Sequence, residues 1–495
     1  MGQYKQLAGQ TLIYGLGTIV PRFLNYFVLT PFYTRIFKDF EYGIVNEFYA
    51  YIVFLLILLT YGTETGYFRF AKEEKNRGEV FSTIMTSIFT TTVLFFLVVF
   101  LFYQDIARFL EYEQNSYLIL LFTSVVAIDA FSAVPFAKLR FQNKAKKFGL
   151  LKIFNVIANL FFNVIFFVLM PYLKTKFPGS PLLLLYNEGI GVGYVFISNL
   201  LAGVFTLILL LPELKIRLSL IQFSLLKQIL KYSLPLLFVG LSGAVNEVAD
   251  KFFLKILIPG RDESLSQIGI YSANYKLGML MTIFIQMFRY AAEPFYFNKM
   301  KDKDAKKVYA NVMKYFILFG FFLFLFVILY LDVLKHFIGS DYHSGLKIVP
   351  IILIANLFLG VVYNLSIWYK LTNLTKYGAM IAFIGAGITV VFNILLIPHL
   401  GYVGSAWTTL ICYMTMAVIS YSLSRKYYKI PYNIKSISLY AAIVMGIFLL
   451  QNYIEYPGLI LKVIINSLFL LGFIIVLIYR EKITYEDVRN FLRRG

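Results

Sequence analysis

The chain has 495 residues, of which 59% are hydrophobic and only 15% are charged, whereas about 25% of residues are charged in an average soluble protein. This composition excludes a soluble globular protein and indicates a chain that lies largely in a lipid bilayer. The formal net charge of +20, from 46 Lys and Arg against 26 Asp and Glu, could indicate a nucleic-acid partner, so its position along the chain has to be established first.

Runs of about 20 apolar residues, the length that crosses a bilayer as a helix, recur along the whole chain. Transmembrane β-strands would be about half as long and would alternate apolar and polar residues. We therefore predict an all-α integral membrane protein with about 14 transmembrane helices. The expected spans are residues 9–34, 43–66, 80–103, 116–137, 149–171, 189–211, 233–258, 269–292, 308–331, 346–369, 377–398, 401–423, 436–454 and 458–479.

Positive charge is concentrated in the loops on one side of this predicted bundle. If the N-terminus is cytoplasmic, about two thirds of the Lys and Arg residues fall in the cytoplasmic loops and tail, as the positive-inside rule requires. Because the number of spans is even, the C-terminus is then cytoplasmic too. Topology and contact with anionic lipid account for the surplus charge, so we expect no nucleic-acid partner.

The sequence repeats itself weakly between its two halves. Residues 41–44, Glu-Tyr-Gly-Ile, are similar to residues 267–270, Gln-Ile-Gly-Ile, and residues 80–85 are similar to residues 308–313. The offset of about 228 residues predicts a duplicated unit of about six helices. Because six is even, the two copies are parallel repeats, related by a pseudo-two-fold axis along the membrane normal and facing each other as two lobes.

This repeat predicts four segments. Residues 1–211 form an N-terminal lobe of six helices, and residues 233–424 form a C-terminal lobe of six. Residues 212–232 between them have an apolar and a basic side, which predicts an amphipathic helix on the cytoplasmic interface or a polar linker. Residues 425–495 hold two further helices and a cytoplasmic tail.

Polar and charged residues inside the spans are the candidates for a substrate site. A charge at the centre of a bilayer costs about 2.5–3.5 kcal/mol on insertion scales, so such groups should face one another or water. The candidate substrate-binding residues are Arg22, Asn25, Asn246, Asp250, Lys251, Asn274, Lys276 and Arg289.

Their spacing sharpens this hypothesis. Arg22 corresponds to Asp250 at the offset of the repeat, so the two could face one cavity, and Lys276 and Arg289 would extend a cationic lining suited to phosphate. Glu247 and Lys251, four residues apart, could form an ion pair. The alternative is that these charges only neutralise each other and hold the bundle together.

Other acids and metal-binding residue types are less informative. Glu47, Glu64 and Glu293 lie near predicted helix ends and could equally be snorkelling or capping groups, and Asp129 could make a packing hydrogen bond. The single cysteine, Cys412, and the three histidines show no spacing typical of a metal site, and no glycine-rich segment continues into a nucleotide-binding loop. We expect neither a metal nor direct ATP hydrolysis.

Several segments resemble the polysaccharide transporter branch of the multidrug/oligosaccharidyl-lipid/polysaccharide exporter superfamily. The similar segments are Thr-Pro-Phe-Tyr-Thr-Arg at 30–35, Glu-Tyr-Gly at 41–43, Tyr-Gly-Thr-Glu-Thr-Gly-Tyr-Phe-Arg-Phe at 61–70, Val-Pro-Phe-Ala-Lys-Leu-Arg at 134–140 and Asn-Ile-Leu-Leu-Ile-Pro-His-Leu-Gly-Tyr-Val-Gly-Ser-Ala at 393–406. Their order and spacing extend over about 400 residues, and the predicted helix count and repeat agree with the resemblance.

The resemblance implies a flippase rather than an enzyme. It would move undecaprenyl-pyrophosphate-linked oligosaccharides for O-antigen, lipopolysaccharide, capsule or exopolysaccharide biosynthesis by alternating access in the bacterial cytoplasmic membrane. Asn25, Asn246 and Asn274 would bind sugar, and H⁺ or Na⁺ coupling could use Glu47, Asp250 or Glu293. The last two helices would form a groove for the polyprenyl tail, and a glycan polymerase and glycosyltransferases are the implied partners.

Two other functions remain open from the sequence. A cation-coupled multidrug exporter of the same superfamily would share the fold, but it would usually have twelve helices and an excess of carboxylates in its cavity. An O-antigen polymerase or membrane glycosyltransferase would be an enzyme, usually with a large catalytic outer loop, whereas the predicted outer loops are short.

Overall fold

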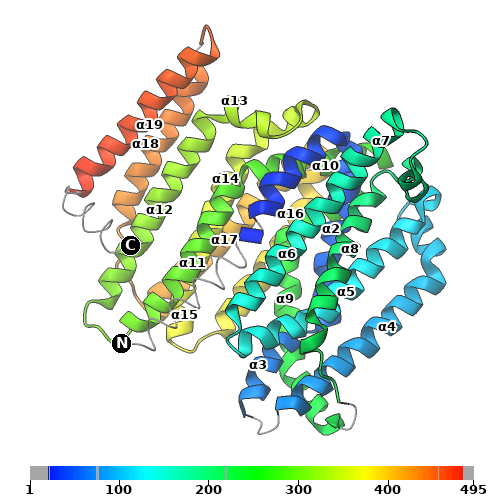
Figure 1. The fold of residues 1–495 in the computed structure, drawn as a ribbon. Helices are drawn as coiled ribbons and strands as arrows, with labels where there is room; N and C mark the ends of the chain where they lie inside the picture. The colour runs from blue at the N-terminus through cyan, green and yellow to red at the C-terminus, as the bar shows by residue number, and fades with distance from the viewer. Residues whose placement is uncertain (1–19, 22, 74–76, 218–219, 455, 483–495) are drawn as a thin grey trace. The chain divides into compact units, whose positions relative to one another are not determined.

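The computed structural model describes residues 20–21, 23–73, 77–217, 220–454 and 456–482 (Figure 1). Within these ranges the regular structure is helical, without strands. Long apolar helices dominate because each satisfies its backbone hydrogen bonds internally, which a hydrocarbon environment demands. The prediction of an all-α membrane protein is confirmed.

The first half of the chain forms seven labelled helices after a helical stretch over residues 23–36. Tyr61 and Gly62, both with positive φ (35° and 73°), separate α2 from α3. The π-helical turn Ile165–Leu169 joins α6 to α7. The bounds are α2 Asp39–Thr60, α3 Thr63–Glu73, α4 Arg77–Phe109, α5 Tyr117–Phe141, α6 Ala145–Val164, α7 Met170–Lys176 and α8 Gly193–Leu210.

The second half contains the longest described helix, α9, and ten further helices. Short 3₁₀ segments, among them Leu211–Glu213, Lys335–Phe337 and Ser340–Ile348, lie at helix ends. The bounds are α9 Phe223–Leu257, α10 Arg261–Leu277, α11 Met279–Lys299, α12 Ala305–Leu329, α13 Leu331–Leu334, α14 Val349–Leu365, α15 Ile367–Leu371, α16 Lys376–Leu400, α17 Tyr402–Tyr427, α18 Ile434–Tyr453 and α19 Leu459–Glu481.

Twelve stretches among the described residues are long and apolar enough to cross a membrane. The pair α10 and α11, bent by 54° at Gly278, gives a thirteenth if it is counted as one span. These thirteen correspond one to one with the second to fourteenth expected spans. Of the first expected span, residues 9–34, residues 20–21 and 23–34 are helical, and residues 9–19 and 22 lie outside the described part of the chain.

The expected amphipathic segment has a protein partner. Helix α9 begins at Phe223, so residues 223–232 are the first turns of this helix and the expected boundary at 232/233 falls inside it. Leu225 and Ile229 are buried in a cluster with Tyr67 of α3 and Phe81 of α4. The basic residues Lys227 and Lys231 are exposed. The apolar side of this segment therefore packs on α3 and α4.

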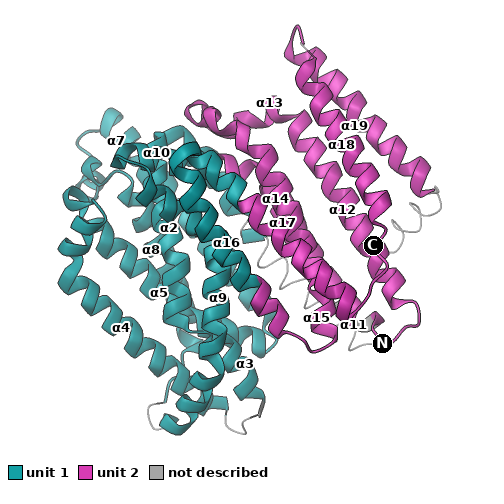
Figure 2. Cartoon of the chain, turned by 180° about the vertical axis from the view of Figure 1, so that it is seen from behind, with its two compact units in different colours: residues 1–272, 382–408 teal, residues 273–381, 409–495 magenta. Residues whose placement is uncertain are grey.

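The chain divides into two compact units by its contacts (Figure 2). Unit 1 comprises residues 1–272 and 382–408, with α2 to α9, most of α10 and most of α16. Unit 2 comprises residues 273–381 and 409–495, with α11 to α15, most of α17, α18 and α19. The two lobes expected from the sequence repeat, residues 1–211 and 233–424, are a different division of the chain from these contact-based units. They remain a prediction.

Each unit has its own packing. In unit 1, α5 contacts α4 and α8, α6 contacts α8, and α2 contacts α9. In unit 2, α12 contacts α14, α18 and α19. Polar bonds fix α19 to α12: Asn466 donates to the carbonyl of Leu329 at 2.5 Å, and Lys314 pairs with Glu481. The two C-terminal helices are thus attached to unit 2 through α12.

Candidate substrate and coupling sites

Helix α9 in unit 1 carries three of the predicted substrate residues. The Asn246 side chain reaches α16: its Nδ2 donates to the carbonyl of Ala382 at 3.3 Å, and its Oδ1 accepts from the Thr389 hydroxyl at 3.2 Å. These bonds hold α9 against α16. Asn246 therefore has a structural role in addition to any contact with sugar.

Asp250 and Lys251 form an ion pair in the same helix. The Lys251 Nζ lies 3.3 Å from Oδ1 of Asp250, and the backbone N–H of Lys251 donates to the same oxygen at 2.9 Å. The two side chains are only 8% and 16% exposed. Removing either partner would leave a nearly buried charge, which is strongly destabilising.

Lys251 pairs with Asp250 and not with Glu247, the partner that the sequence spacing suggested. Glu247 is exposed, whereas Lys251 turns to Asp250 and lies 5.6 Å from the centre of the Tyr271 ring on α10. A spacing of four residues allows an ion pair but does not rank it against an adjacent carboxylate. Lys251 is thus a neutralised cation on α9.

Glu47 on α2 is 1% exposed and accepts hydrogen bonds from two tyrosines. The Tyr51 hydroxyl donates to Oε1 at 2.5 Å, and the Tyr112 hydroxyl donates to Oε2 at 2.6 Å. Beside it, Lys255 of α9 lies 5.7 Å from the centre of the Tyr112 ring, and its Nζ is 3.2 Å from Oε2 of Glu111. Glu47 is therefore a hydrogen-bonded core group and does not snorkel.

In unit 2, Arg289 and Glu293 lie at one small polar pocket. Arg289 is exposed, and its guanidinium carbon is 5.0 Å from the centre of the Tyr363 ring. Glu293 pairs with Lys370 of α15, with 2.7 Å between Nζ and Oε1. Because Lys370 neutralises Glu293, Arg289 supplies a net positive charge to the pocket.

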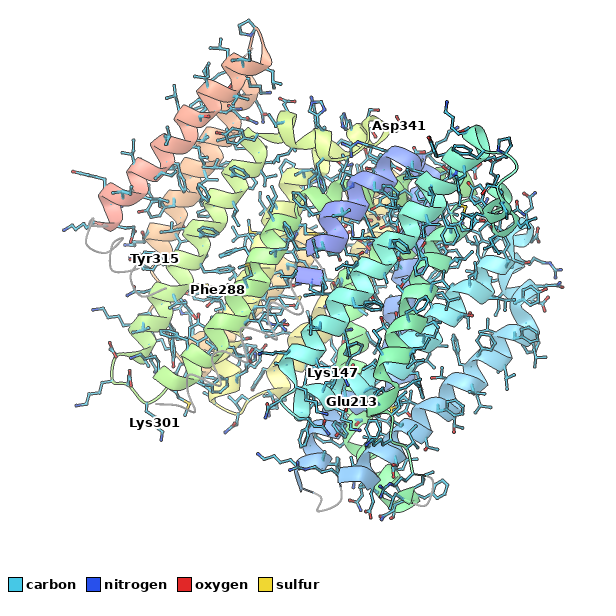
Figure 3. The ribbon with its side chains drawn as sticks, viewed as in Figure 1. Lys147, Glu213, Phe288, Lys301, Tyr315 and Asp341 are labelled. Atoms are coloured by element: carbon cyan, nitrogen blue, oxygen red, sulfur yellow. The ribbon has the colours of Figure 1, made fainter. Side chains whose placement is uncertain are left out.

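The floor of this pocket contains a buried amide. Asn364 of α14 is 3% exposed, and its Oδ1 accepts a hydrogen bond from the Tyr296 hydroxyl. Its Nδ2 has no hydrogen-bond partner among the residues that the structure describes. The pocket, which Phe288 also lines (Figure 3), has a volume of about 20 Å³, enough for one water-sized group. A ligand oxygen could occupy it.

The remaining predicted residues are less exposed or lie outside the described part. Asn274 is fully buried and donates to the carbonyl of Tyr342 at 2.8 Å, and Lys276 is half-buried. Arg22 lies outside the described residues. Its neighbour Asn25 has a buried Oδ1 for which no partner is found within the described ranges.

The structure thus groups the candidates into two sets, each within one unit. Asn246, Asp250 and Lys251 come together on α9 in unit 1, and Arg289 and Glu293 come together on α11 in unit 2. Sequence reasoning missed Lys370, Asn364 and the tyrosine partners of Glu47. Lys370 is 77 residues from Glu293, so no local spacing could have indicated the pair.

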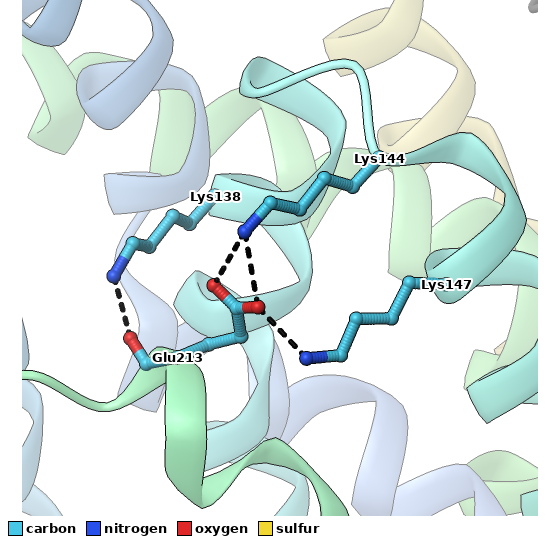
Figure 4. A network of polar contacts seen from close by, with 4 residues as sticks. All are labelled: Lys138, Lys144, Lys147 and Glu213. Atoms are coloured by element: carbon cyan, nitrogen blue, oxygen red, sulfur yellow. Dashed lines mark hydrogen bonds and ion pairs between the residues drawn. The ribbon is translucent and has the colours of Figure 1, made fainter.

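A further network lies at the end of α8 in unit 1 (Figure 4). Glu213 accepts from Lys144 at 3.1 and 3.2 Å and from Lys147 at 2.8 Å, and its carbonyl accepts from Lys138 at 2.5 Å. Glu64, another predicted terminal group, pairs with Arg140 at 2.7 Å. These contacts fix the basic loop between α5 and α6, which is a structural role.

No group of three or more His, Cys, Asp or Glu side chains in the described part of the chain could hold a metal ion. Cys412 is buried, and its thiol lies 3.8 Å from the Met416 sulfur. The His343 Nε2–H donates to the backbone carbonyl of Lys335 at 3.0 Å.

A family model described as "Polysaccharide biosynthesis protein" matches residues 7–300 of the chain. This match covers more than half of the sequence and includes α2 to α11. No curated protein matches the chain in sequence.

Solved structures share the fold at low sequence identity. Lipid II flippase MurJ in an inward closed conformation superposes with a TM-score of 0.70 and 14% identity, over 95% of this chain and 100% of that chain. An inward-facing multidrug resistance MATE family transporter of the MOP superfamily gives a TM-score of 0.60 and 13% identity, over 87% and 96%. An outward-facing one gives 0.56 and 15%, over 88% and 96%.

Proposed function

The chain belongs to the polysaccharide biosynthesis protein family, and from this premise we propose that it flips undecaprenyl-pyrophosphate-linked oligosaccharide repeat units across the bacterial cytoplasmic membrane. It is a multi-pass membrane protein with the fold of MOP-superfamily transporters. The proposed products serve O-antigen, capsule or exopolysaccharide biosynthesis. Transport proceeds by alternating access, with both termini in the cytoplasm.

The observation that carries this proposal is the Arg289 pocket in unit 2. A guanidinium binds phosphate oxygens through several donors at once, and Arg289 is exposed where it can do so. The buried Nδ2 of Asn364 adds a second donor that has no partner among the described residues. A diphosphate oxygen would satisfy both groups, whereas a cationic drug would be repelled by the net charge.

The other predicted binding residues extend this site. Arg22, Asn25, Asn246 and Asn274 would contact sugar or phosphate, and Lys251 and Lys276 would add positive charge. The pairing of Lys251 with Asp250 supports a conditional role, since protonation of Asp250 would free the ammonium for an anionic substrate. Glycosyltransferases and a glycan polymerase would act before and after translocation.

Coupling to H⁺ or Na⁺ is proposed to use Glu47, Asp250 or Glu293. Glu293 and Asp250 each have an ammonium partner, so protonation of either would release a cation. Glu47 accepts hydrogen bonds from the hydroxyls of Tyr51 and Tyr112, so its protonation would rearrange the two tyrosines. A pH gradient across vesicles should drive transport in the wild-type protein and lose its effect in the variant of the coupling carboxylate.

Substitution of Arg289 tests the proposed site. We expect Arg289→Gln to lower the initial rate of lipid-linked oligosaccharide translocation in vesicles by about 10- to 100-fold, because a charge-assisted contact to phosphate contributes about 1.5–3 kcal/mol. Arg289→Lys should retain part of the rate, because it keeps the charge and loses the fork of donors. Asn364→Ala should weaken transport less.

The matched control is Arg425→Gln, which removes an exposed arginine from the last turn of α17 in the same unit. It should leave translocation unchanged. Equal loss in both variants would show that general charge, and not the pocket, matters. Efflux of cationic drugs without movement of oligosaccharide would replace the proposal by a multidrug exporter, and lengthening of the glycan would replace it by an enzyme.

A further inference from the structure

Unit 1 contains an open-sided apolar cavity of about 660 Å³ lined by residues of α2, α4, α5 and α9, by Leu110 just after α4 and by Val390 of α16. Fourteen of its sixteen lining residues have no polar side-chain atom. Its walls include Phe54, Phe95, Phe122 and Phe252 from four different helices. Pockets of about 300–1,000 Å³ are typical of ligand sites, so the cavity is large enough for a ligand.

The two polar side-chain atoms in the cavity wall, the hydroxyls of Tyr51 and Thr123, both donate hydrogen bonds within the protein. The Tyr51 hydroxyl donates to Glu47 at 2.5 Å, and the Thr123 hydroxyl donates to the carbonyl of Ile119 at 2.6 Å. A buried water needs two to four polar partners, so water would be poorly held here. The volume is about twenty times the ~30 Å³ share of one water molecule, which is room for one hydrocarbon chain.

The depth of the cavity corresponds to one leaflet of a bilayer. Its lining on α9 extends from Val245 to Ile256, and the eleven steps between these residues rise about 16 Å. Half of the hydrocarbon core of a bilayer is about 15 Å thick. Ile256 is 74% exposed, so the cavity is open to its surroundings at this end. With the N-terminus in the cytoplasm, as proposed, the cavity spans the outer leaflet.

Charged groups of both signs lie at the same end. Leu110 and Ile256 line the cavity, and the residues next to them, Glu111 and Lys255, form an ion pair at 3.2 Å. A zwitterionic phospholipid headgroup would complement this pair, its phosphate meeting the ammonium and its amine meeting the carboxylate. An isoprenoid diphosphate would present negative charge alone to Glu111.

We propose that this cavity is a binding site for one acyl chain of an outer-leaflet zwitterionic phospholipid, whose headgroup lies at Lys255 and Glu111. The bound chain fills the space between α4 and α9 and keeps water out of it. Burial of each methylene group contributes favourably, and the effect accumulates along the chain. This inference goes beyond the proposed transport function and does not depend on the transported substrate, but its assignment to the outer leaflet rests on the topology proposed there.

Native mass spectrometry of the intact protein, released from vesicles of phosphatidylethanolamine and phosphatidylglycerol, tests the site. The wild-type protein should retain one phosphatidylethanolamine per chain. Val245→Phe, which places an aromatic ring in the cavity where the acyl chain would lie, should lose it. Val239→Phe, the same change on the same helix at a 39% exposed residue that does not line the cavity, should keep it. Lys255→Gln should keep a lipid with reduced headgroup selectivity.

A second measurement does not depend on variants. Phosphatidylethanolamine with a photoreactive group on its acyl chain should label residues 95–123 and 245–256 of the wild-type protein. Labelling elsewhere only, retention of an isoprenoid phosphate in place of the phospholipid, a wild-type protein without bound lipid, or equal retention in Val245→Phe and Val239→Phe would each overturn the proposal. None of these readouts requires transport.

Discussion

At the scale of single residues, the charges in the bundle are mostly satisfied by groups far away in the sequence. Glu47 accepts its second hydrogen bond from Tyr112, 65 residues later in the chain. Glu293 forms an ion pair with the ammonium of Lys370, 77 residues later. From the sequence, such groups should face one another or water, because an unpaired charge in hydrocarbon is too costly, and snorkelling or capping remained open for Glu47 and Glu293. The sequence could not identify the partners, because only the fold brings them together.

Tyr112 provides a test of the Glu47 cluster. Tyr112→Phe removes one donor from a buried carboxylate, so we expect it to destabilise the protein by about 1–3 kcal/mol. A thermal unfolding scan in detergent measures the change. Tyr479→Phe, at an 82% exposed position on α19, is the control and should unfold like the wild type. Equal transition temperatures for all three proteins would argue against a stabilising role for the cluster.

Asp332 on α13 gives a prediction for the pH dependence of stability. Hydrogen bonds from Lys335 at 2.8 Å and Lys462 at 2.5 Å hold the pKa of its carboxyl below the ordinary value. A lowered folded pKa means that the stabilisation is complete above the unfolded value of about 3.9 and is lost as the pH falls through the folded one.

The wild-type protein should therefore be more stable than Asp332→Asn between pH 5 and 7, by an amount that is constant in this range. The difference should shrink below about pH 4. The unfolding temperatures of the wild type and Asp332→Asn, measured from below pH 4 up to pH 7, show whether the difference in stability changes in this way. A difference that grows as the pH falls would have the wrong sign for this ion pair.

At the scale of helices, the backbones of α2 and α10 in unit 1 approach each other closely at two glycines. A methyl group on Gly43 would lie 1.9 Å from the carbonyl oxygen of Leu265, and one on Gly269 would lie 2.0 Å from that of Asp39. Ser266 also donates to Asp39 at 2.5 Å. Gly43 and Gly269 occupy equivalent positions in the predicted sequence repeat, so the two copies of the repeat meet at the same glycine.

Alanine substitutions at two glycines should have opposite effects. Gly43→Ala forces α2 away from α10 and should cost about 1–3 kcal/mol. Gly243→Ala in α9, where an added methyl group meets no atom within 4 Å, should be neutral or stabilising, since alanine favours a helix by about 1 kcal/mol over glycine. Thermal unfolding of the two variants compares them, and equal effects would contradict the close packing.

The bounds and bends of the helices show which features of the fold could not be predicted from sequence patterns. Hydropathy placed the thirteen described spans correctly, because their apolar runs have bilayer length. It did not indicate the bend of 54° between α10 and α11 or the π-helical turn after α6, because both depend on packing and not on hydrophobicity. The start of α9 was placed ten residues late, since the basic residues of its first turns resemble a linker.

At the scale of the whole molecule, the family match and the fold support a common interpretation. The family model covers residues 7–300, and transporters with lipidic and drug substrates share the fold. Fold alone does not identify a substrate. The choice of an anionic, lipid-linked substrate therefore depends on Arg289, which the sequence already indicated as a candidate, and on the amide of Asn364, which it did not.

The most direct test of the proposed function is translocation by the purified protein alone. Vesicles that contain the protein and a fluorescent undecaprenyl-pyrophosphate-linked oligosaccharide in both leaflets are treated with a membrane-impermeant quencher. If the chain is the flippase, all of the fluorescence should become accessible, while vesicles without protein should retain the protected inner half. Protection of the same half with and without the folded protein, under an imposed pH or Na⁺ gradient, would contradict the account.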